Sequence, residues 1–210
     1  MTRTRIKFCG IRRKADAEAA VGLGVDALGF VLVPQSRRYL APEAAAAVRN
    51  ALPPFVDAVA LFMDAPAVEV QRAIDVLRPD LLQFHGREDP AFCASFGLPY
   101  LKAIAMGEGR SPGGELRRFR SAAAVLLDAH VPGGMGGRGE PFDWSQAIRT
   151  RTPIILAGGL TPQNVGSGIR QLRPYAVDVS SGIELRPGVK DLDKMRAFVR
   201  AVRRADGALQ

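Results

Sequence analysis

The chain has 210 residues, of which 47% are hydrophobic and 24% are charged, and its formal net charge is +8. These values are ordinary for a globular protein and exclude a disordered chain, and the apolar runs fall short of the roughly 18 residues of a membrane-spanning helix. The positive charges are scattered singly and in pairs, which favours a solvated surface that attracts anionic substrates over a nucleic-acid-binding surface.

Eight short runs of β-branched and aliphatic residues recur along the chain, and each predicts a β-strand. In chain order they cover residues 5–8, 27–33, 56–62, 81–84, 100–104, 124–127, 154–156 and 176–179. The stretches between them predict helices, two of which show the i, i+3, i+4, i+7 spacing of an amphipathic helix. The residues with this spacing are Val70, Ala73, Ile74 and Leu77 in one helix, and Met195, Phe198, Val199 and Val202 in the last helix.

Prolines indicate where several of these helices begin. Asp89-Pro90 and Thr161-Pro162 each place a capping oxygen before a proline, whose missing N–H costs nothing in the first helical turn. Pro42 is expected to begin a further helix after the second strand. The fifth unit is the weakest, because residues 107–114 have the composition of a loop and the helix after them is short.

The alternation of strands and helices predicts parallel strands joined by right-handed crossovers. Eight units fit a closed barrel or an open doubly wound sheet, and their number favours the barrel. A G-x-G-x-x-G fingerprint after the first strand is also missing. We therefore predict an α/β fold, a (β/α)₈ TIM barrel formed by one domain over residues 1–210. The N-terminus lacks a signal-peptide pattern, and Cys9 and Cys93 are far apart, so we expect a cytoplasmic protein with free thiols.

In a barrel, the residues that follow the strands meet at one face, and two of them form a candidate catalytic pair. Cys9 ends the first strand beside Gly10, where a thiolate can abstract a carbon-bound proton. Asp128 ends the sixth strand, before a glycine-rich segment at residues 133–139 that is a candidate mobile cover, and it can supply the complementary proton. The alternatives are an inert buried cysteine and an aspartate that caps a helix.

Two later segments predict an anion site. The first, after the seventh strand, contains Gly158 and Gly159, and the second, after the eighth, contains Asp178, Ser180, Ser181 and Gly182. Barrels often bind phosphate between these two loops, where backbone N–H groups face the ligand. Tight turns that need glycine are the alternative for each loop, but their joint presence favours phosphate.

Two further side chains are candidates for substrate binding. Arg38 follows the second strand, and its guanidinium can hold a carboxylate through two parallel hydrogen bonds, whereas its neighbour Arg37 fits a solvated role. His85 follows the fourth strand and either contacts substrate or is held by a backbone carbonyl. The sequence shows no His, Cys or carboxylate set with metal-ligand spacing, so we expect no metal.

Short segments along nearly the whole chain match one family pattern. They are residues 7–11 (KFCGI), 29–31 (GFV), 36–39 (SRRY), 83–86 (QFHG), 127–128 (LD), 142–144 (FDW), 158–160 (GGL) and 176–182 (AVDVSSG). Each segment is weak alone, but their order together is specific, and the chain resembles the phosphoribosylanthranilate isomerase family. Two positions depart from the family pattern, with Ala157 where a serine is usual and Arg138 where a lysine is frequent.

The resemblance implies an Amadori rearrangement in tryptophan biosynthesis. The reaction converts N-(5-phosphoribosyl)anthranilate to 1-(2-carboxyphenylamino)-1-deoxyribulose 5-phosphate. By family position, Cys9 is similar to the general base, Asp128 to the general acid, and Arg38 to the residue that binds the anthranilate carboxylate. Gly159 and the turn at residues 180–182 fall where the family binds phosphate, and the role of His85 stays open. We expect no cofactor, because the iminium formed from the sugar is the electron sink.

Other functions were weighed against this one. A metal-dependent epimerase barrel needs histidines and carboxylates at strand ends, and indole-glycerol phosphate synthase needs a catalytic lysine, for which Lys102 is the candidate. Cys9 and Asp128 argue against a non-catalytic phosphometabolite or nucleic-acid binder. We expect a small phosphorylated substrate, no nucleic acid and no membrane. The sequence leaves open a monomer or a homodimer, and whether the related histidine-pathway substrate is accepted.

Overall fold

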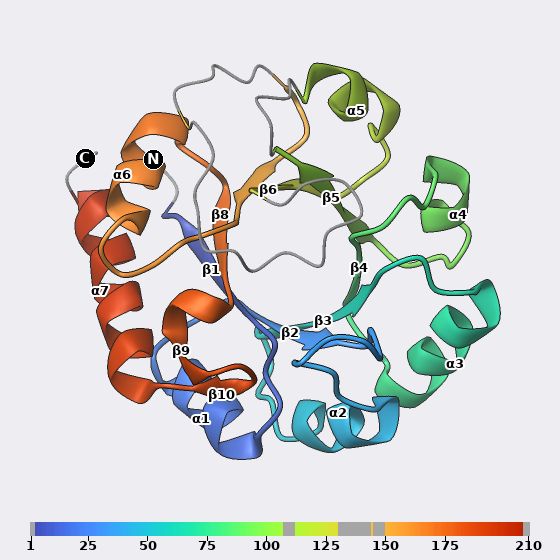
Figure 1. Cartoon of the computed structure of the whole chain (residues 1–210), viewed down its shortest axis with the longest axis horizontal. Helices are drawn as coiled ribbons and strands as arrows, with labels where there is room; N and C mark the ends of the chain where they lie inside the picture. Colours follow the sequence, from blue (N-terminus) through green and yellow to red (C-terminus); the bar gives the residue numbers. More distant parts are fainter. Residues whose placement is uncertain (1–2, 107–111, 130–143, 145–149, 208–210) are drawn as a thin grey trace.

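The computed structural model describes residues 3–106, 112–129, 144 and 150–207. Within these residues, eight parallel strands close into a barrel in chain order, and the described helices lie around its outside (Figure 1). The predicted fold class is therefore confirmed. The glycine-rich segment at residues 133–139, with Arg138, lies outside the described residues, as do residues 107–111 of the weak fifth unit and residues 142–143 of the FDW segment.

The strands match the predicted runs closely. They are β1 (Arg5–Cys9), β2 (Ala27–Val31), β3 (Asp57–Phe62), β4 (Leu81–Phe84), β5 (Tyr100–Ala105), β6 (Ala124–Asp128), β7 (Ile154–Leu156) and β8 (Ala176–Val179). The sequence placed Cys9 and Asp128 at the ends of their strands, and they are the last residues of β1 and β6. The second strand ends two residues earlier than predicted, at Val31.

The described residues form seven α-helices, two of which begin at the prolines that the sequence indicated, Pro42 and Pro90. They are α1 (Lys14–Gly22), α2 (Pro42–Arg49), α3 (Ala67–Leu77), α4 (Pro90–Ala94), α5 (Gly113–Arg118), α6 (Val165–Leu172) and α7 (Leu192–Gly207). Asp89 caps α4 by accepting a hydrogen bond from the Phe92 N–H at 2.8 Å. The helix predicted to begin at Pro162 begins three residues later, at Val165, although the Thr161 Oγ1 does accept the Gln163 N–H at 3.3 Å. Asn164 organises a turn there by accepting the Thr161 N–H and donating to the Gly159 carbonyl, both at 2.8 Å.

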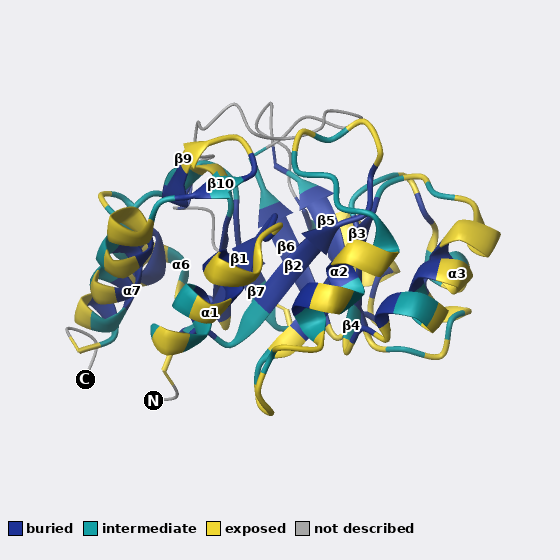
Figure 2. Cartoon of the chain, turned by 90° about the horizontal axis from the view of Figure 1, so that it is seen from below, coloured by how far each residue is buried: buried dark blue, intermediate teal, exposed yellow. Residues whose placement is uncertain are grey.

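The core has two layers, one between the barrel and its helices and one inside the barrel. The outer layer holds the large side chains, such as Phe8 of β1, whose ring packs edge-on against Phe198 of α7 at 6.1 Å. The predicted stripe of α7 is buried, whereas Ile74 of α3 is only partly buried. The inside of the barrel is filled by smaller residues such as Val59 and Ala103. Figure 2 shows this arrangement, with buried strands between helices whose outer faces are exposed.

A short hairpin follows β8 and was not predicted. A 3₁₀ turn (Ser181–Ile183) leads into β9 (Glu184–Arg186), which pairs antiparallel with β10 (Val189–Lys190). Strands of three and two residues are too short to show an alternating pattern in the sequence. Figure 1 shows that the hairpin lies near β1 and α1, which brings its side chains close to the end of the first strand. In the described part of the chain, no helix has the length and apolar character needed to span a membrane.

Candidate active site

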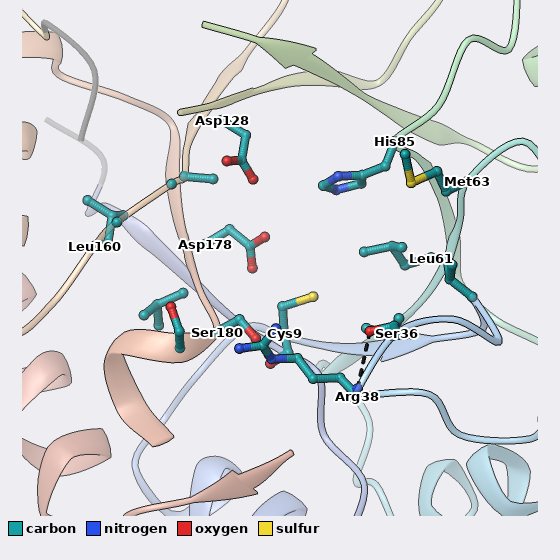
Figure 3. Close-up of a pocket in the computed structure, with 17 residues that line it drawn as sticks. Cys9, Ser36, Arg38, Leu61, Met63, His85, Asp128, Leu160, Asp178 and Ser180 are labelled. Atoms are coloured by element: carbon teal, nitrogen blue, oxygen red, sulfur yellow. Dashed lines mark hydrogen bonds between the residues drawn. The ribbon is translucent and has the colours of Figure 1, made fainter. Parts of the chain in front are cut away.

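A cavity opens at the carboxyl ends of the barrel strands and collects nearly all of the candidate residues. Those that line it are Cys9, Arg38, His85, Asp128, Gly158, Gly159, Asp178, Ser180 and Ser181. Figure 3 shows the side chains of Cys9, Asp128 and Asp178 directed into this cavity, with His85 facing Asp128 from the other side. Among the described residues, the remaining candidate, Gly182, does not line the cavity. The fold thus brings residues from six different strand ends to one place.

Cys9 lies at the bottom of this cavity with 6% of its surface exposed. Burial raises the pKa of its thiol, while the nearby ammonium groups of Lys7 and Lys190 lower it and Asp178 raises it further. On the neighbouring strand β2, Gly29 lies directly opposite Cys9. A Cβ atom on Gly29 would be only 2.9 Å from the Cys9 Sγ, so only glycine leaves room for the thiol.

Gly10 follows Cys9 and has a φ of +73°, a conformation that favours glycine. A Cβ there would meet the Arg38 Cδ at 2.7 Å and the Ser180 Oγ at 3.2 Å. In the structure, these two side chains occupy the space next to Gly10, and this glycine is what allows them to pass close to the end of β1.

Lys7 and Asp178 form an ion pair inside the barrel, below Cys9. They lie opposite each other on β1 and β8, and the Lys7 Nζ donates to the Asp178 Oδ1 at 3.0 Å. Their side chains are 5% and 7% exposed. Burial lowers the pKa of Lys7, but Asp178 and Cys9 outweigh it and leave that pKa raised. Burial raises the pKa of Asp178, and Lys7 opposes this only in part.

A second group of buried charges lies beside Cys9, and Arg38 belongs to it. The Arg38 Nε and Nη2 donate to the two carboxylate oxygens of Glu184, at 2.9 and 2.8 Å. The Lys190 Nζ donates to the same carboxylate at 3.0 Å, to the Cys9 carbonyl at 2.6 Å and to the Ser180 carbonyl at 3.1 Å. Burial raises the pKa of Glu184, but Arg38 and Lys190 outweigh it and leave that pKa lowered.

The bonds to Glu184 use one edge of the Arg38 guanidinium. Its Nη1 makes no hydrogen bond within the described part of the chain, so the Nη1–Nη2 edge can still receive a ligand carboxylate in two parallel bonds. Sequence reasoning missed Glu184 and Lys190, which lie on the unpredicted hairpin. It also gave no role to Lys7, although a lysine within an otherwise apolar strand is a signal that could have been used.

The loop after β7 packs tightly against the end of β6, where Asp128 is half-buried. Gly158 has a φ of +78°, and a Cβ on it would lie 2.2 Å from the Ala129 nitrogen and 2.9 Å from the Asp128 Oδ1. The Asp128 carbonyl in turn accepts the Met106 N–H at 2.8 Å. Gly158 is therefore required for this close approach, which fixes the backbone that carries Asp128.

The two loops of the predicted anion site touch each other. A Cβ on Gly182 would lie 1.9 Å from the Leu160 carbonyl oxygen, so the loop after β8 rests on the loop after β7. Gly159 has a φ of +65°, and its N–H makes no hydrogen bond with another described residue. The Ser180 Oγ donates to the Cys9 carbonyl at 3.0 Å, which ties the site to β1.

His85 reaches the cavity from the loop after β4. Its backbone N–H donates to the Phe62 carbonyl at 2.9 Å, and its Nε2 contacts the amide nitrogen of Gln83. Gln83 is fully buried, and its Oε1 has no hydrogen-bond partner among the described residues. As for metals, the described residues contain no group of three or more His, Cys, Asp or Glu that could hold an ion.

Comparisons with known proteins agree on one family. The family model for N-(5'-phosphoribosyl)anthranilate (PRA) isomerase matches residues 6–201. The chain is 52% identical to the N-(5'-phosphoribosyl)anthranilate isomerase of Stenotrophomonas maltophilia over 207 residues, which cover 97% of this chain and 95% of that one.

Solved structures give the same result. The phosphoribosyl anthranilate isomerase of Thermus thermophilus has a TM-score of 0.87 and 40% identity, over 99% of this chain and 100% of that one. A phosphoribosyl anthranilate isomerase in complex with reduced 1-(o-carboxyphenylamino)-1-deoxyribulose 5-phosphate has a TM-score of 0.82 and 33% identity. That match covers 95% of this chain and 98% of the other.

Proposed function

The chain belongs to the N-(5'-phosphoribosyl)anthranilate isomerase family, and we propose that it performs the family reaction with Cys9 as general base and Asp128 as general acid. The reaction is the Amadori rearrangement of N-(5'-phosphoribosyl)anthranilate in tryptophan biosynthesis. The observation that carries the proposal is the position of these two residues, which end β1 and β6 and line the same cavity. A reaction that needs one proton acceptor and one proton donor fits this placement.

The chemistry needs only these two groups and the substrate. Asp128 donates a proton to the ribose ring oxygen as the C1–O bond breaks, and the nitrogen lone pair forms an iminium at C1. The Cys9 thiolate then removes the proton from C2, and the electron pair of that C–H bond forms the double bond of an enolamine. Ketonisation places a proton on C1. C1 is thus reduced and C2 oxidised within one molecule, so electrons balance without an external oxidant.

Two anionic groups orient the substrate across the cavity. The phosphate binds at Gly159 and the turn of residues 180–182, where two loops meet and backbone donors are available. The carboxylate of the anthranilate binds the Nη1–Nη2 edge of Arg38. Asp178 points into the cavity near Cys9 and His85 reaches it from the other side, and both are placed to contact the ribose chain.

The proposed chemistry also indicates the cellular location and the partners of the enzyme. A thiol base must stay reduced, which favours the cytoplasm, and both cysteines are free and buried. The partner is the small phosphorylated substrate rather than nucleic acid or membrane. The chain works as a monomer or a homodimer, because the cavity is lined from within one barrel.

The test is an assay that follows the loss of phosphoribosylanthranilate fluorescence with the purified chain and no added cofactor. We expect catalytic loss of fluorescence with formation of the ketose product. A parallel reaction with the histidine-pathway aminoimidazole substrate measures whether the cavity also accepts it. If fluorescence decays only at the uncatalysed rate, the proposal is wrong. Conversion of the ketose product, supplied in a separate reaction, to indole-glycerol phosphate would favour the synthase alternative instead.

A further inference from the structure

We infer that Lys7, anchored by Asp178, is a positioning residue that holds an ammonium group beside the Cys9 sulfur from inside the barrel and stabilises the thiolate. The inference rests on the proposed role of Cys9 as the base. It assigns a function to a buried ion pair that the reaction steps above do not use.

The placement of Lys7 follows from strand geometry. Lys7 and Cys9 are two residues apart on β1, so their side chains point to the same face of the strand, which is the inside of the barrel. Ile6 and Phe8 point the other way and belong to the layer packed under the helices. Lys7 therefore lies directly beneath Cys9, with its ammonium group shielded from water on the closed side of the cavity.

Gly29 fixes how close the ammonium and the thiol are. The Cβ position of Gly29 lies 2.9 Å from the Cys9 Sγ and 3.0 Å from the Lys7 Nζ, so both atoms border the same small gap. Any side chain at this position would fill the gap and separate the two groups. An opposite charge within about 4–6 Å lowers the pKa of an acid by about 1–3 units, which is the effect that a buried thiol base requires.

Asp178 keeps Lys7 charged. A buried ammonium without a counterion tends to lose its proton, because desolvation disfavours the charged form. The Asp178 carboxylate lies directly across from Lys7 in the strand register and accepts its hydrogen bond at 3.0 Å. Besides this bond, the Lys7 ammonium interacts with the Cys9 thiol itself. Two of its three N–H groups thus stay available for the thiolate.

Lys190 is the other ammonium near Cys9, but it is engaged elsewhere. Its three N–H groups donate to the Cys9 carbonyl, the Ser180 carbonyl and Glu184, so it holds the backbone rather than the sulfur. The charged and titratable groups that surround Cys9 are Lys7 on its own strand, Asp178 on β8, Lys190 on β10, Arg38 after β2, His85 after β4 and Asp128 on β6. Within this set, Lys7 combines a buried charge, closeness to the sulfur and free donor groups.

The test measures the ionisation of Cys9 directly, without turnover. Iodoacetamide alkylation of Cys9, identified by peptide mass spectrometry, is followed as a function of pH in the wild type and in Lys7→Met. We expect the midpoint of the alkylation profile to move to higher pH by about one unit or more in the variant. At a fixed pH below the midpoint, the alkylation rate should then fall about tenfold. The limb of the kcat profile that reports the base should move in the same direction, with KM little changed.

Two further variants keep the result decisive. Lys7→Met/Asp178→Asn removes both charges, so no unpaired carboxylate remains in the barrel. It should show an upward shift smaller than that of Lys7→Met, because Asp178 itself raises the pKa of Cys9. Lys102→Met is the matched control, because Lys102 also forms a buried pair, with Glu88 at 2.8 Å, but does not line the cavity. It should leave the Cys9 profile unchanged.

An unchanged midpoint in Lys7→Met/Asp178→Asn would overturn the inference. An equal shift in Lys102→Met would also overturn it, since the effect would then belong to any buried lysine. Failure of the proposed function has a different signature, namely normal turnover in a variant that lacks the Cys9 thiol, whatever the alkylation profiles show.

Discussion

The two sides of the cavity differ in the side chains that surround their proposed catalytic groups, Cys9 and Asp128. Cys9 stands among buried ions, with Lys7, Asp178, Glu184 and Lys190 each less than 10% exposed. On the opposite side, Asp128 is half-buried beside the loop after β7. The described residues that line the cavity there are Asp128, Ala157, Gly158, Gly159 and Leu160, none of which is positively charged.

The difference follows from what each group must do. A base has to be deprotonated before the reaction, and burial of a thiol opposes this, so fixed cations are needed around it. An acid has to hold its proton until the ring opens. Strands β1 and β8 and the β9–β10 hairpin carry the ions, whereas the loop after β7 approaches the end of β6 through Gly158.

The largest expected effect comes from the side of the cavity that holds Asp128. Asp128→Asn removes the proton donor but keeps the shape of the side chain, so we expect kcat to fall by about 10²–10⁴ with KM within a few fold. Steady-state kinetics measure both constants, and circular dichroism checks that the variant folds. Turnover close to the wild type would remove Asp128 from the mechanism.

The next largest effect is expected from Arg38, on the side of the cavity that holds the buried ions. Arg38→Met removes the group that receives the anthranilate carboxylate, a charged hydrogen-bonded contact worth about 1.5–3 kcal/mol. KM should rise by roughly tenfold to a hundredfold, which is more than kcat falls. Arg37→Met is the control, since Arg37 is exposed and does not line the cavity. An unchanged kcat/KM in Arg38→Met would place this arginine outside the substrate site.

A smaller effect on activity is expected from Glu184→Gln, which loosens Arg38 and Lys190 without removing either. KM should rise by a few fold. The clearer readout is stability against pH, because the pKa of Glu184 is lowered in the folded chain. Its contribution is therefore present above the unfolded pKa of about 4.3 and is lost as the pH falls through the lower folded value. Urea unfolding between pH 3 and about 7 should show a shallower acid loss in the variant. Equal slopes would contradict this account of Glu184.

The smallest expected effect is the stabilisation of the fold by an anion bound at the predicted phosphate site. Sulfate or inorganic phosphate should bind at Gly159 and residues 180–182 and should protect against thermal unfolding by about 1.4 kcal/mol at ten times its dissociation constant. A titration by thermal scanning measures the protection. A crystal grown in sulfate, with this place empty and an anion bound elsewhere in the cavity, would count against the site.

The sequence predicted the strands well because their residues are continuous apolar runs, which parallel strands covered on both faces require. It also predicted the positions of Cys9 and Asp128, since a polar residue at the end of such a run has to lie at one face of a closed barrel. The start of α6 was predicted three residues too early, because Thr161 and Asn164 together form a turn before the helix begins at Val165. Glu184 and Lys190 were missed because their hairpin is too short for a pattern, and their pairing with Arg38 joins positions far apart in the chain.

The most direct test of the central claim, that Cys9 removes the C2 proton, is a single-turnover measurement of phosphoribosylanthranilate fluorescence with Cys9→Ser. A hydroxyl of much higher pKa cannot act as the base near neutral pH, so the rate should fall by about 10²–10⁴. The affinity for a reduced product analogue should stay within a few fold of the wild type. A folded Cys9→Ser variant that turns over its substrate at nearly the wild-type rate would contradict the account.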